Sequence, residues 1–236
     1  MKSNIIPAIM PQKFFAIEDS VNLVRHAVGM VQLDLMDGKY VPEKTWPFHY
    51  KNDHDLRDLI AQDISLPLWE EIDYELDLMV ERPEEQLDTW LQIGAARVIF
   101  HYASIHDWDK IRDIGPGVRN FIKIGLAVTI HDDLEKACLL VEEGLFDYIQ
   151  VMGISRIGYM GEPFATDSLA IIRDLKKKYP HMMITVDGGV SLDTIADLAN
   201  VGATEFVSGS GVFGGGEVEE NIYNLEDESG LFSDQD

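Results

Sequence analysis

The stretch VQLDLMDGKYVP, residues 31–42, decides how the rest of the chain is interpreted. It predicts a buried strand over 31–36 that runs into a turn-forming Asp-Gly pair. Gln32 and Asp34 are two residues apart and therefore project from the same face of that strand. A carboxylate inside an apolar strand costs free energy unless it is paired, hydrogen-bonded or used in chemistry. We interpret Asp34 as a residue that is used in chemistry.

Expected strands and helices alternate along the remaining sequence. Strands are expected at 4–10, 31–36, 72–80, 96–101, 121–128, 146–152, 182–187 and 205–208, with a helix after each of the first seven. The first of these helices is expected over 17–27. Repeats of roughly 20 to 35 residues in this order imply a parallel sheet with crossover helices. Eight such units predict a closed (β/α)8 TIM barrel, whose typical length is about 250 residues. An open doubly wound sheet is the alternative, but no G-x-G-x-x-G follows the first strand.

The domain boundary is expected near the last glycine run. Residues 1–216 are expected to form a single barrel domain, and residues 217–236 to add a short helix and an acidic, disordered tail. The amphipathic part of this end covers 218–225. The long loop at 153–164 contains Gly158 and Gly161, and we expect either a flexible lid over the barrel mouth or a plain surface loop.

Composition limits the partners and the location. The chain has 19 Lys and Arg against 42 Asp and Glu, a net charge of -23, so nucleic acid and anionic membrane surfaces should be repelled. The one cysteine, Cys138, rules out an internal disulfide and fits a cytoplasmic location. We expect neither a membrane span nor a secretory signal, because apolar runs are short. Barrels of this type often associate, so we expect a homo-oligomer.

Polar residues at the predicted strand ends form the candidate site, because active sites of such barrels lie there. The candidates are Gln32, Asp34, Asp77, His101 and Asp187. Asp34 and Asp187 belong to strands that are nearly opposite in the ring. Two carboxylates on opposite faces of one carbon suit a two-base proton transfer, in which one removes a proton next to a carbonyl and the other returns it. The alternative is that each aspartate only caps a loop.

Glycines after the last two predicted strands form a second group. Gly188 and Gly189 follow the seventh strand, while Gly209 and Ser210 follow the eighth. In this architecture the loops after strands seven and eight often bind phosphate, and glycine allows close approach of the backbone. The pattern therefore predicts a phosphate site beside the aspartates.

Five sequence blocks together resemble the ribulose-phosphate 3-epimerase family. They are LDLMDGKYVP (33–42), DLMVERPE (77–84), GLAV (125–128), ITVDGGV (184–190) and VSGSGVFG (207–214). The resemblance covers residues 5 to about 214. It implies a (β/α)8 barrel that uses Asp34 and Asp187 as the acid/base pair. The further residues it implies are Gly188, Gly189, Gly209 and Ser210 for phosphate, and Met36, Met79 and Met152 for the substrate pocket. We also place His101 in the substrate pocket, and a hydrogen-bonded strand-end histidine explains it better than a metal ligand. The methionines are equally well explained as core residues.

The chain departs from this family at the metal site. Family members bind a divalent metal through two histidines and the two catalytic aspartates, whereas Gln32 and Asp77 stand at the histidine positions here. The set Gln32, Asp34, Asp77 and Asp187 offers only oxygen ligands, which favours Mg²⁺ or Mn²⁺ over Zn²⁺ or Fe²⁺. If no metal binds, the crowded carboxylates should retain at least one proton near pH 7.

The resemblance implies an isomerase that converts D-ribulose 5-phosphate to D-xylulose 5-phosphate, or acts on a close analogue. A non-catalytic relative that binds a sugar phosphate is the first alternative, because both histidines are replaced. A Mg²⁺-dependent decarboxylase or aldolase of a related barrel family ranks lower. Enzymes of that kind have the motif D-x-K-x-x-D on the third strand, whereas Met79 occupies the lysine position here.

Overall fold

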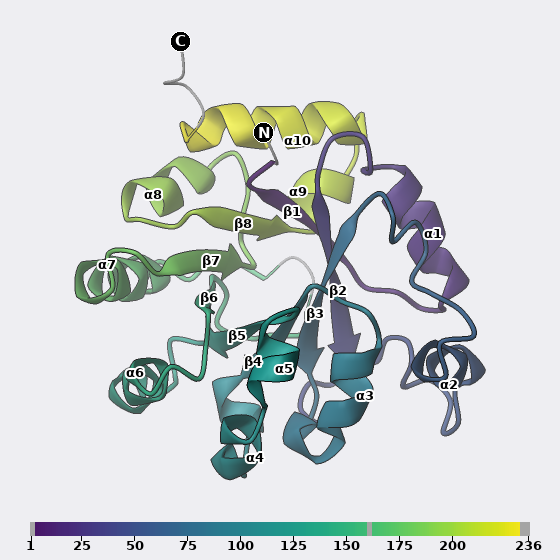
Figure 1. Ribbon diagram of the computed structural model, residues 1–236. Helices are drawn as coiled ribbons and strands as arrows, with labels where there is room; N and C mark the ends of the chain where they lie inside the picture. Colours follow the sequence, from purple (N-terminus) through teal and green to yellow (C-terminus); the bar gives the residue numbers. More distant parts are fainter. Residues whose placement is uncertain (1–2, 160–161, 232–236) are drawn as a thin grey trace.

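The eight predicted strands are all present and form a closed ring. The computed structural model describes residues 3–159 and 162–231. The strands are β1 (Ile5–Ile9), β2 (Met30–Met36), β3 (Asp73–Met79), β4 (Arg97–His101), β5 (Lys123–Val128), β6 (Tyr148–Met152), β7 (Met183–Asp187) and β8 (Glu205–Ser208). Each pairs in parallel with the next, and β8 closes onto β1 (Figure 1). The predicted (β/α)8 TIM barrel is confirmed.

Helices surround the strands, as Figure 1 shows. They are α1 (Phe15–Asn22), α2 (His54–Ile60), η1 (Pro83–Gln86), α3 (Leu87–Gln92), η2 (Tyr102–Ser104), α4 (Trp108–Arg112), α5 (Pro116–Arg119), α6 (Leu134–Glu142), α7 (Ser168–Lys178), α8 (Ile195–Asn200), α9 (Ser210–Phe213) and α10 (Val218–Ser229). Asp53, Asp107 and Asp133 cap α2, α4 and α6 by accepting backbone amide hydrogens. The helix predicted over 17–27 ends early, at Asn22. α5 was not predicted, and it begins at Pro116, a residue favoured in a first turn.

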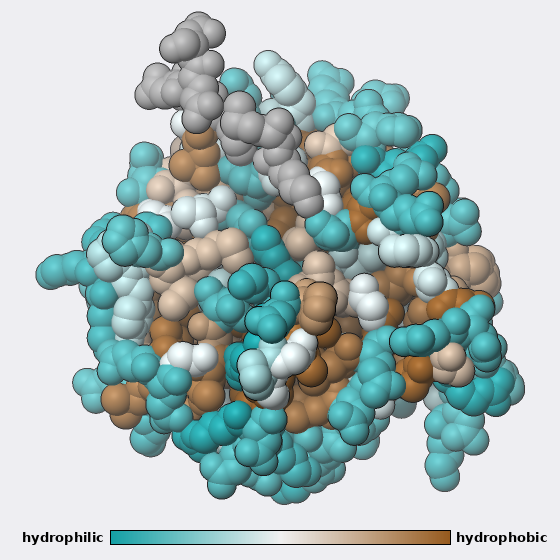
Figure 2. Space-filling view, viewed as in Figure 1, coloured by the Kyte–Doolittle hydropathy of each residue, from teal (hydrophilic) through white to brown (hydrophobic). Residues whose placement is uncertain are grey.

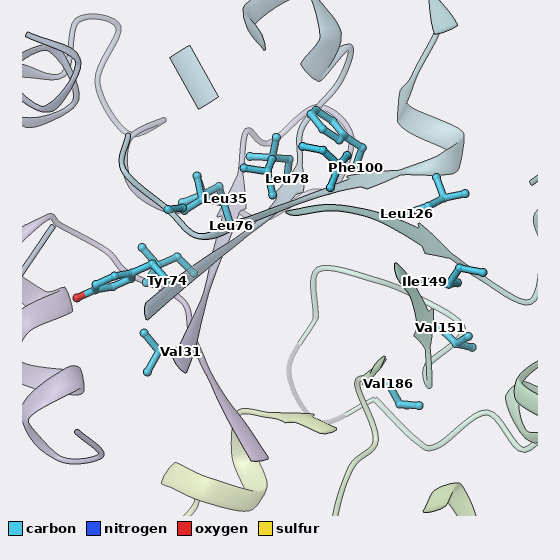
Figure 3. Packing of buried hydrophobic residues seen from close by; sticks show 14 of the residues in the cluster. Val31, Leu35, Tyr74, Leu76, Leu78, Phe100, Leu126, Ile149, Val151 and Val186 are labelled. Atoms are coloured by element: carbon cyan, nitrogen blue, oxygen red, sulfur yellow. The ribbon is translucent and has the colours of Figure 1, made fainter. Parts of the chain in front are cut away.

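Side chains on each strand alternate between the surrounding helices and the barrel interior. Figure 3 shows Leu35, Leu78, Phe100 and Ile149 among the apolar side chains that point outward from the ring into the main core. The alternate positions point inward. They include Gln32, Asp34, Glu75, Asp77, His101, Tyr148, Gln150 and Asp187, all buried. The interior of this barrel is therefore unusually polar, and its charges must be compensated locally.

Strand register decides which interior side chains are neighbours. β2 and β3 align Asp34 with Asp77, while β6 and β7 align Met152 with Asp187. Neighbouring strands lie about 4.8 Å apart, so aligned side chains of the interior set are adjacent. The register therefore places two carboxylates side by side at one edge of the ring.

Most charged side chains lie at the surface of the protein. Figure 2 shows hydrophilic residues around the rim of the face that it displays and hydrophobic residues toward the centre of that face. Among the described residues the buried carboxylates are Asp34, Asp37, Glu75, Asp77, Glu84 and Asp187.

Within 3–159 and 162–231, no helix has both the length and the apolar character required to cross a membrane.

The last helix, α10, lies against the barrel beside the N-terminal strand (Figure 1). Ile222 and Leu225 are buried, and Asn4 Nδ2 donates to Ser229 Oγ at 3.4 Å. The helix runs beyond the predicted 218–225 and ends at Gly230, whose φ of 66° suits a helix C-terminus. Of the tail predicted to be disordered, residues 232–236 lie outside the described residues.

Truncation of Leu225 should destabilise the whole barrel. Leu225→Ala removes a side chain that is 1% exposed, and such changes cost about 2–5 kcal/mol. Tyr223→Ala on the same helix, where the side chain is 64% exposed, should change stability by less than about 0.5 kcal/mol. Chemical denaturation measures both. Equal effects of the two substitutions would contradict this placement of α10.

Candidate active site

A cavity of about 590 Å³ lies at the carboxyl ends of the strands. Asp34 from β2 and Asp187 from β7 line it. The loops after β7 and β8 contribute Gly188, Gly189, Gly209 and Ser210, and Met79 and Met152 add thioether side chains. The two aspartates predicted to transfer protons and the residues predicted to bind phosphate therefore surround one space.

Three carboxylates form a cluster beneath this cavity. Asp34, Asp77 and Asp187 each offer one oxygen, and these atoms lie within 4.8 Å of one another. Asp34 and Asp187 are 8% and 9% exposed, whereas Asp77 is fully buried. Within the cluster, only the two predicted acid/base residues reach the cavity.

Gln32 links these two aspartates. Its Nε2 donates to Asp34 Oδ1 at 2.9 Å and to Asp187 Oδ2 at 3.0 Å. The side chain is fully buried, and its Oε1 has no hydrogen-bond partner. The four residues predicted as metal ligands, Gln32, Asp34, Asp77 and Asp187, are thus brought together, with one amide oxygen left unsatisfied.

Gln150 on β6 is a member of this site that the sequence analysis missed. Its Nε2 lies 3.3 Å from Asp77 Oδ2 and 3.4 Å from Asp187 Oδ2. Its Oε1 is also buried without a partner. The sequence signal was a single polar residue in the apolar strand YIQVM, the same signal that identified Gln32.

Two residues predicted for the substrate pocket, His101 and Met36, are not among the described residues that line the cavity. His101 is 1% exposed, and its Nε2 lies 2.7 Å from Asp77 Oδ1. Met36 is fully buried and packs with Val41 and Met79, and Tyr40 and Ile157 pack against the same group. Both strand-end side chains do point inward, but the loop after β2 folds over them.

Burial and mutual repulsion change the acidity of the cluster. Burial, followed by the charges of Asp187 and Asp77, raises the pKa of Asp34 well above its ordinary value. Burial, followed by Asp77, raises the pKa of Asp187 to about 7. Burial alone would lower the pKa of His101, but Asp77, through its charge and its hydrogen bond, and the charges of Asp187 and Asp132 together leave that pKa raised. Near neutral pH the cavity therefore presents carboxyl groups that can either accept or donate a proton.

A separate ion-pair network fills the barrel below the site. Arg97 donates to both oxygens of Glu205, at 2.5 and 3.0 Å, and to Glu75 Oε2 at 3.4 Å. Tyr148 donates its hydroxyl hydrogen to the same Glu75 oxygen at 2.6 Å. Burial raises the pKa of Glu75 to about 7 although Arg97 lowers it. This network supports the floor of the carboxylate cluster and does not reach the cavity.

The loop after β7 needs both of its glycines. Gly188 and Gly189 have φ values of 89° and 68°, which side chains rarely adopt. Cβ atoms there would lie 2.8 Å from Ile154 Cγ1 and 3.0 Å from Phe164 Cδ2, respectively. Ile154 and Phe164 form a bridge at the base of the predicted lid, 153–164. Gly158 of that loop is described, and Gly161 lies outside the described residues.

Paired acidic groups and glycine-rich loops at the carboxyl ends of barrel strands are typical of (β/α)8 enzymes that bind phosphorylated substrates. The chain belongs to the ribulose-phosphate 3 epimerase family, whose family model matches residues 4–213. The resemblance found in the five sequence blocks is thereby confirmed.

Several relatives extend over nearly the whole chain. Ribulose-phosphate 3-epimerase of Schizosaccharomyces pombe is 28% identical, with 95% of this chain and 93% of the relative covered. The cytoplasmic isoform of this enzyme from Oryza sativa subsp. japonica is also 28% identical, over 94% and 92%. That of Treponema pallidum is 29% identical, over 89% and 91%.

Solved structures show the same fold in more distant proteins. A crystal structure of KGPDC from Streptococcus mutans has a TM-score of 0.71 at 12% identity, over 96% of both chains. The 3-hexulose-6-phosphate synthase of Salmonella typhimurium has a TM-score of 0.64 at 17% identity, over 97% of this chain and 98% of that one. At these identities the likeness concerns the fold alone.

Replacement of Asp187 should change how stability depends on pH. The pKa of Asp187 is raised from 3.8 to about 7, so between these values the native state keeps a proton that the unfolded state has released. Rising pH therefore removes stability across this interval. In chelator, Asp187→Asn should be more stable relative to the wild type at pH 8 than at pH 4, as measured by denaturation midpoints.

The exposed Asp174 on α7 provides a matched control, because Asp174→Asn makes the same change outside the cluster. The difference in stability between Asp174→Asn and the wild type should be the same at pH 8 and at pH 4. A stability gap between Asp187→Asn and the wild type that does not vary with pH would contradict the raised pKa.

Proposed function

We propose that this chain is an isomerase that epimerises C3 of a ketose phosphate, D-ribulose 5-phosphate or a close analogue. Asp34 and Asp187 would be its two proton-transferring groups. One observation carries the proposal: of the three clustered carboxylates, only these two reach the cavity, and they come from β2 and β7. The names of the relatives support the reaction.

The proposed reaction balances its protons when one of the two carboxyl groups is ionised and the other is protonated. The ionised aspartate removes the C3 proton from one face of the substrate, and the protonated aspartate returns a proton to the opposite face. The configuration at C3 inverts, and the two aspartates exchange roles. The exchange requires that one of the two aspartates be protonated, and in the metal-free site the raised pKa values of Asp34 and Asp187 keep a proton in the cluster near neutrality.

The donor set of the cluster fits a hard divalent cation. Three carboxylates and the unsatisfied Gln32 Oε1 are oxygen donors, and His101 is directed at Asp77 instead. Oxygen donors suit Mg²⁺ or Mn²⁺ better than Zn²⁺ or Fe²⁺. Gln32, Asp34, Asp77 and Asp187 would hold the ion. A bound cation would stabilise the negative charge that develops on the substrate when C3 loses its proton.

The substrate phosphate would be held by backbone groups. Among the described residues that line the cavity there are no lysines, arginines or histidines, while Glu162 and Asp193 add negative charge. Gly188, Gly189, Gly209 and Ser210 surround one part of the same space. Backbone amides are the donors left for an anion in such a setting. Met79 and Met152 would contact the apolar side of the sugar.

The cellular setting is also a proposal. Cytoplasmic location is supported by the single, buried Cys138 and by the rice relative, which is a cytoplasmic isoform. Self-association into a homo-oligomer stays a prediction.

Hydrogen exchange at C3 tests the proposed reaction. In D₂O the protein should exchange the C3 proton of D-ribulose 5-phosphate, followed by proton NMR, with Mg²⁺ or Mn²⁺ and not in chelator. Asp34→Asn and Asp187→Asn should each lower the rate by about 10²–10⁴-fold, the usual contribution of a positioned acid or base. Asp174→Asn on the exposed face of α7 should exchange normally.

Absence of exchange with every metal would contradict epimerisation of this sugar phosphate. Binding of the sugar phosphate without exchange would then favour the non-catalytic relative.

A methyl group at Gly209 tests the phosphate site. Gly209 has φ of -90°, and a Cβ there would have no neighbour closer than 3.6 Å, so Gly209→Ala should fold normally. The methyl group would occupy space at the cavity lining. Inorganic phosphate should compete for this site with an affinity at least about tenfold lower than in the wild type, because the backbone can no longer approach the phosphate closely. Unchanged competition would place the phosphate elsewhere.

A further inference from the structure

Gln32 and Gln150 share an arrangement that hydrogen bonding alone explains poorly. Both side chains are fully buried inside the barrel, on β2 and β6. Each directs Nε2 at two carboxylates of the cluster, and each leaves Oε1 buried without a partner. Buried amide oxygens are nearly always satisfied in folded proteins, so two unsatisfied ones at one site need a cause.

The contacts of Gln150 are particularly weak as hydrogen bonds. Its Nε2 has three acceptors, Asp77 Oδ2 at 3.3 Å, Asp187 Oδ2 at 3.4 Å and Met152 Sδ at 3.7 Å. An amide nitrogen carries only two hydrogens, and good N–H···O bonds are about 2.9–3.0 Å long. Gln150 therefore is not held in place by strong donation to the carboxylates.

The same separations suit ligands of a common metal ion. Adjacent oxygen ligands of an octahedral ion with bonds of about 2.0–2.1 Å lie about 3 Å apart. The four distances from the glutamine nitrogens to the carboxylate oxygens are 2.9, 3.0, 3.3 and 3.4 Å. Rotation of each amide by half a turn exchanges nitrogen and oxygen, and so places the unsatisfied oxygens where these nitrogens lie.

We propose that Gln150 is a fifth oxygen ligand of a divalent cation, beside Gln32, Asp34, Asp77 and Asp187, and that both amides turn their oxygens to the ion when it binds. Asp34 and Asp187 reach the cavity and form the access route, while Gln150 and Asp77 form the buried side of the site. The inference rests on the metal centre of the proposed function and is independent of the sugar chemistry.

Metal binding in the absence of any sugar tests this inference. Metal-stripped protein is titrated with Mn²⁺ alone by calorimetry. Gln150→Met keeps the volume and removes the oxygen, and should raise the Mn²⁺ dissociation constant by at least about tenfold. Gln150→Glu supplies an oxygen with a charge and should bind Mn²⁺ at least as tightly as the wild type. Gln92→Met, at an exposed position, should bind like the wild type.

Metal preference shows whether the side chain at position 150 reaches the ion. Gln150→His would replace an oxygen ligand by a nitrogen and should raise the ratio of Zn²⁺ to Mn²⁺ affinity. An unchanged ratio would mean that the side chain at position 150 does not reach the ion, which would overturn the inference. It would also be overturned by equal Mn²⁺ dissociation constants for wild type and Gln150→Met, or by a wild type that binds no Mn²⁺. Since no sugar is present, loss of the proposed isomerase activity would leave these results intact.

Discussion

Mutual repulsion among three buried carboxylates is the constraint on which the rest of this site depends. Asp34, Asp77 and Asp187 are buried away from water, where like charges cannot all persist without compensation. The structure supplies amide hydrogens from two glutamines and an imidazole from His101. These groups and a retained proton hold the cluster together, and a divalent cation would do the same with a larger charge.

The barrel places this cluster through simple geometric rules. Alternation along the strands directs one set of side chains inward, and the register of β2 and β3 sets Asp34 beside Asp77. Closure of the ring brings Asp187 from β7 to the same point. The Arg97–Glu75–Glu205 network below the cluster keeps the floor of the barrel polar but paired. Chemistry at the mouth is thus supported by charge compensation at the base.

Much of this arrangement was predictable from local patterns. Eight strands, their inward aspartates and the glycine loops after β7 and β8 all follow from strand periodicity and from the order of the elements. Gln150 was not predicted, because one polar residue in YIQVM is also compatible with a hydrogen-bonded core residue. Met36 and His101 point inward but do not line the cavity, and periodicity could not show this, because it gives the direction of a side chain and not what covers it. The extension of α10 to Ser229 depends on tertiary contacts that the acidic sequence does not reveal.

The most direct test of the account is a crystal structure of the protein with Mn²⁺ and D-ribulose 5-phosphate, with anomalous scattering used to locate the ion. The account predicts a manganese peak bonded to Asp34, Asp77, Asp187 and the amide oxygens of Gln32 and Gln150. It also predicts C3 of the sugar between Asp34 and Asp187, with the phosphate at Gly188, Gly189, Gly209 and Ser210. An ion elsewhere, or a sugar that contacts only one of the two aspartates, would contradict it.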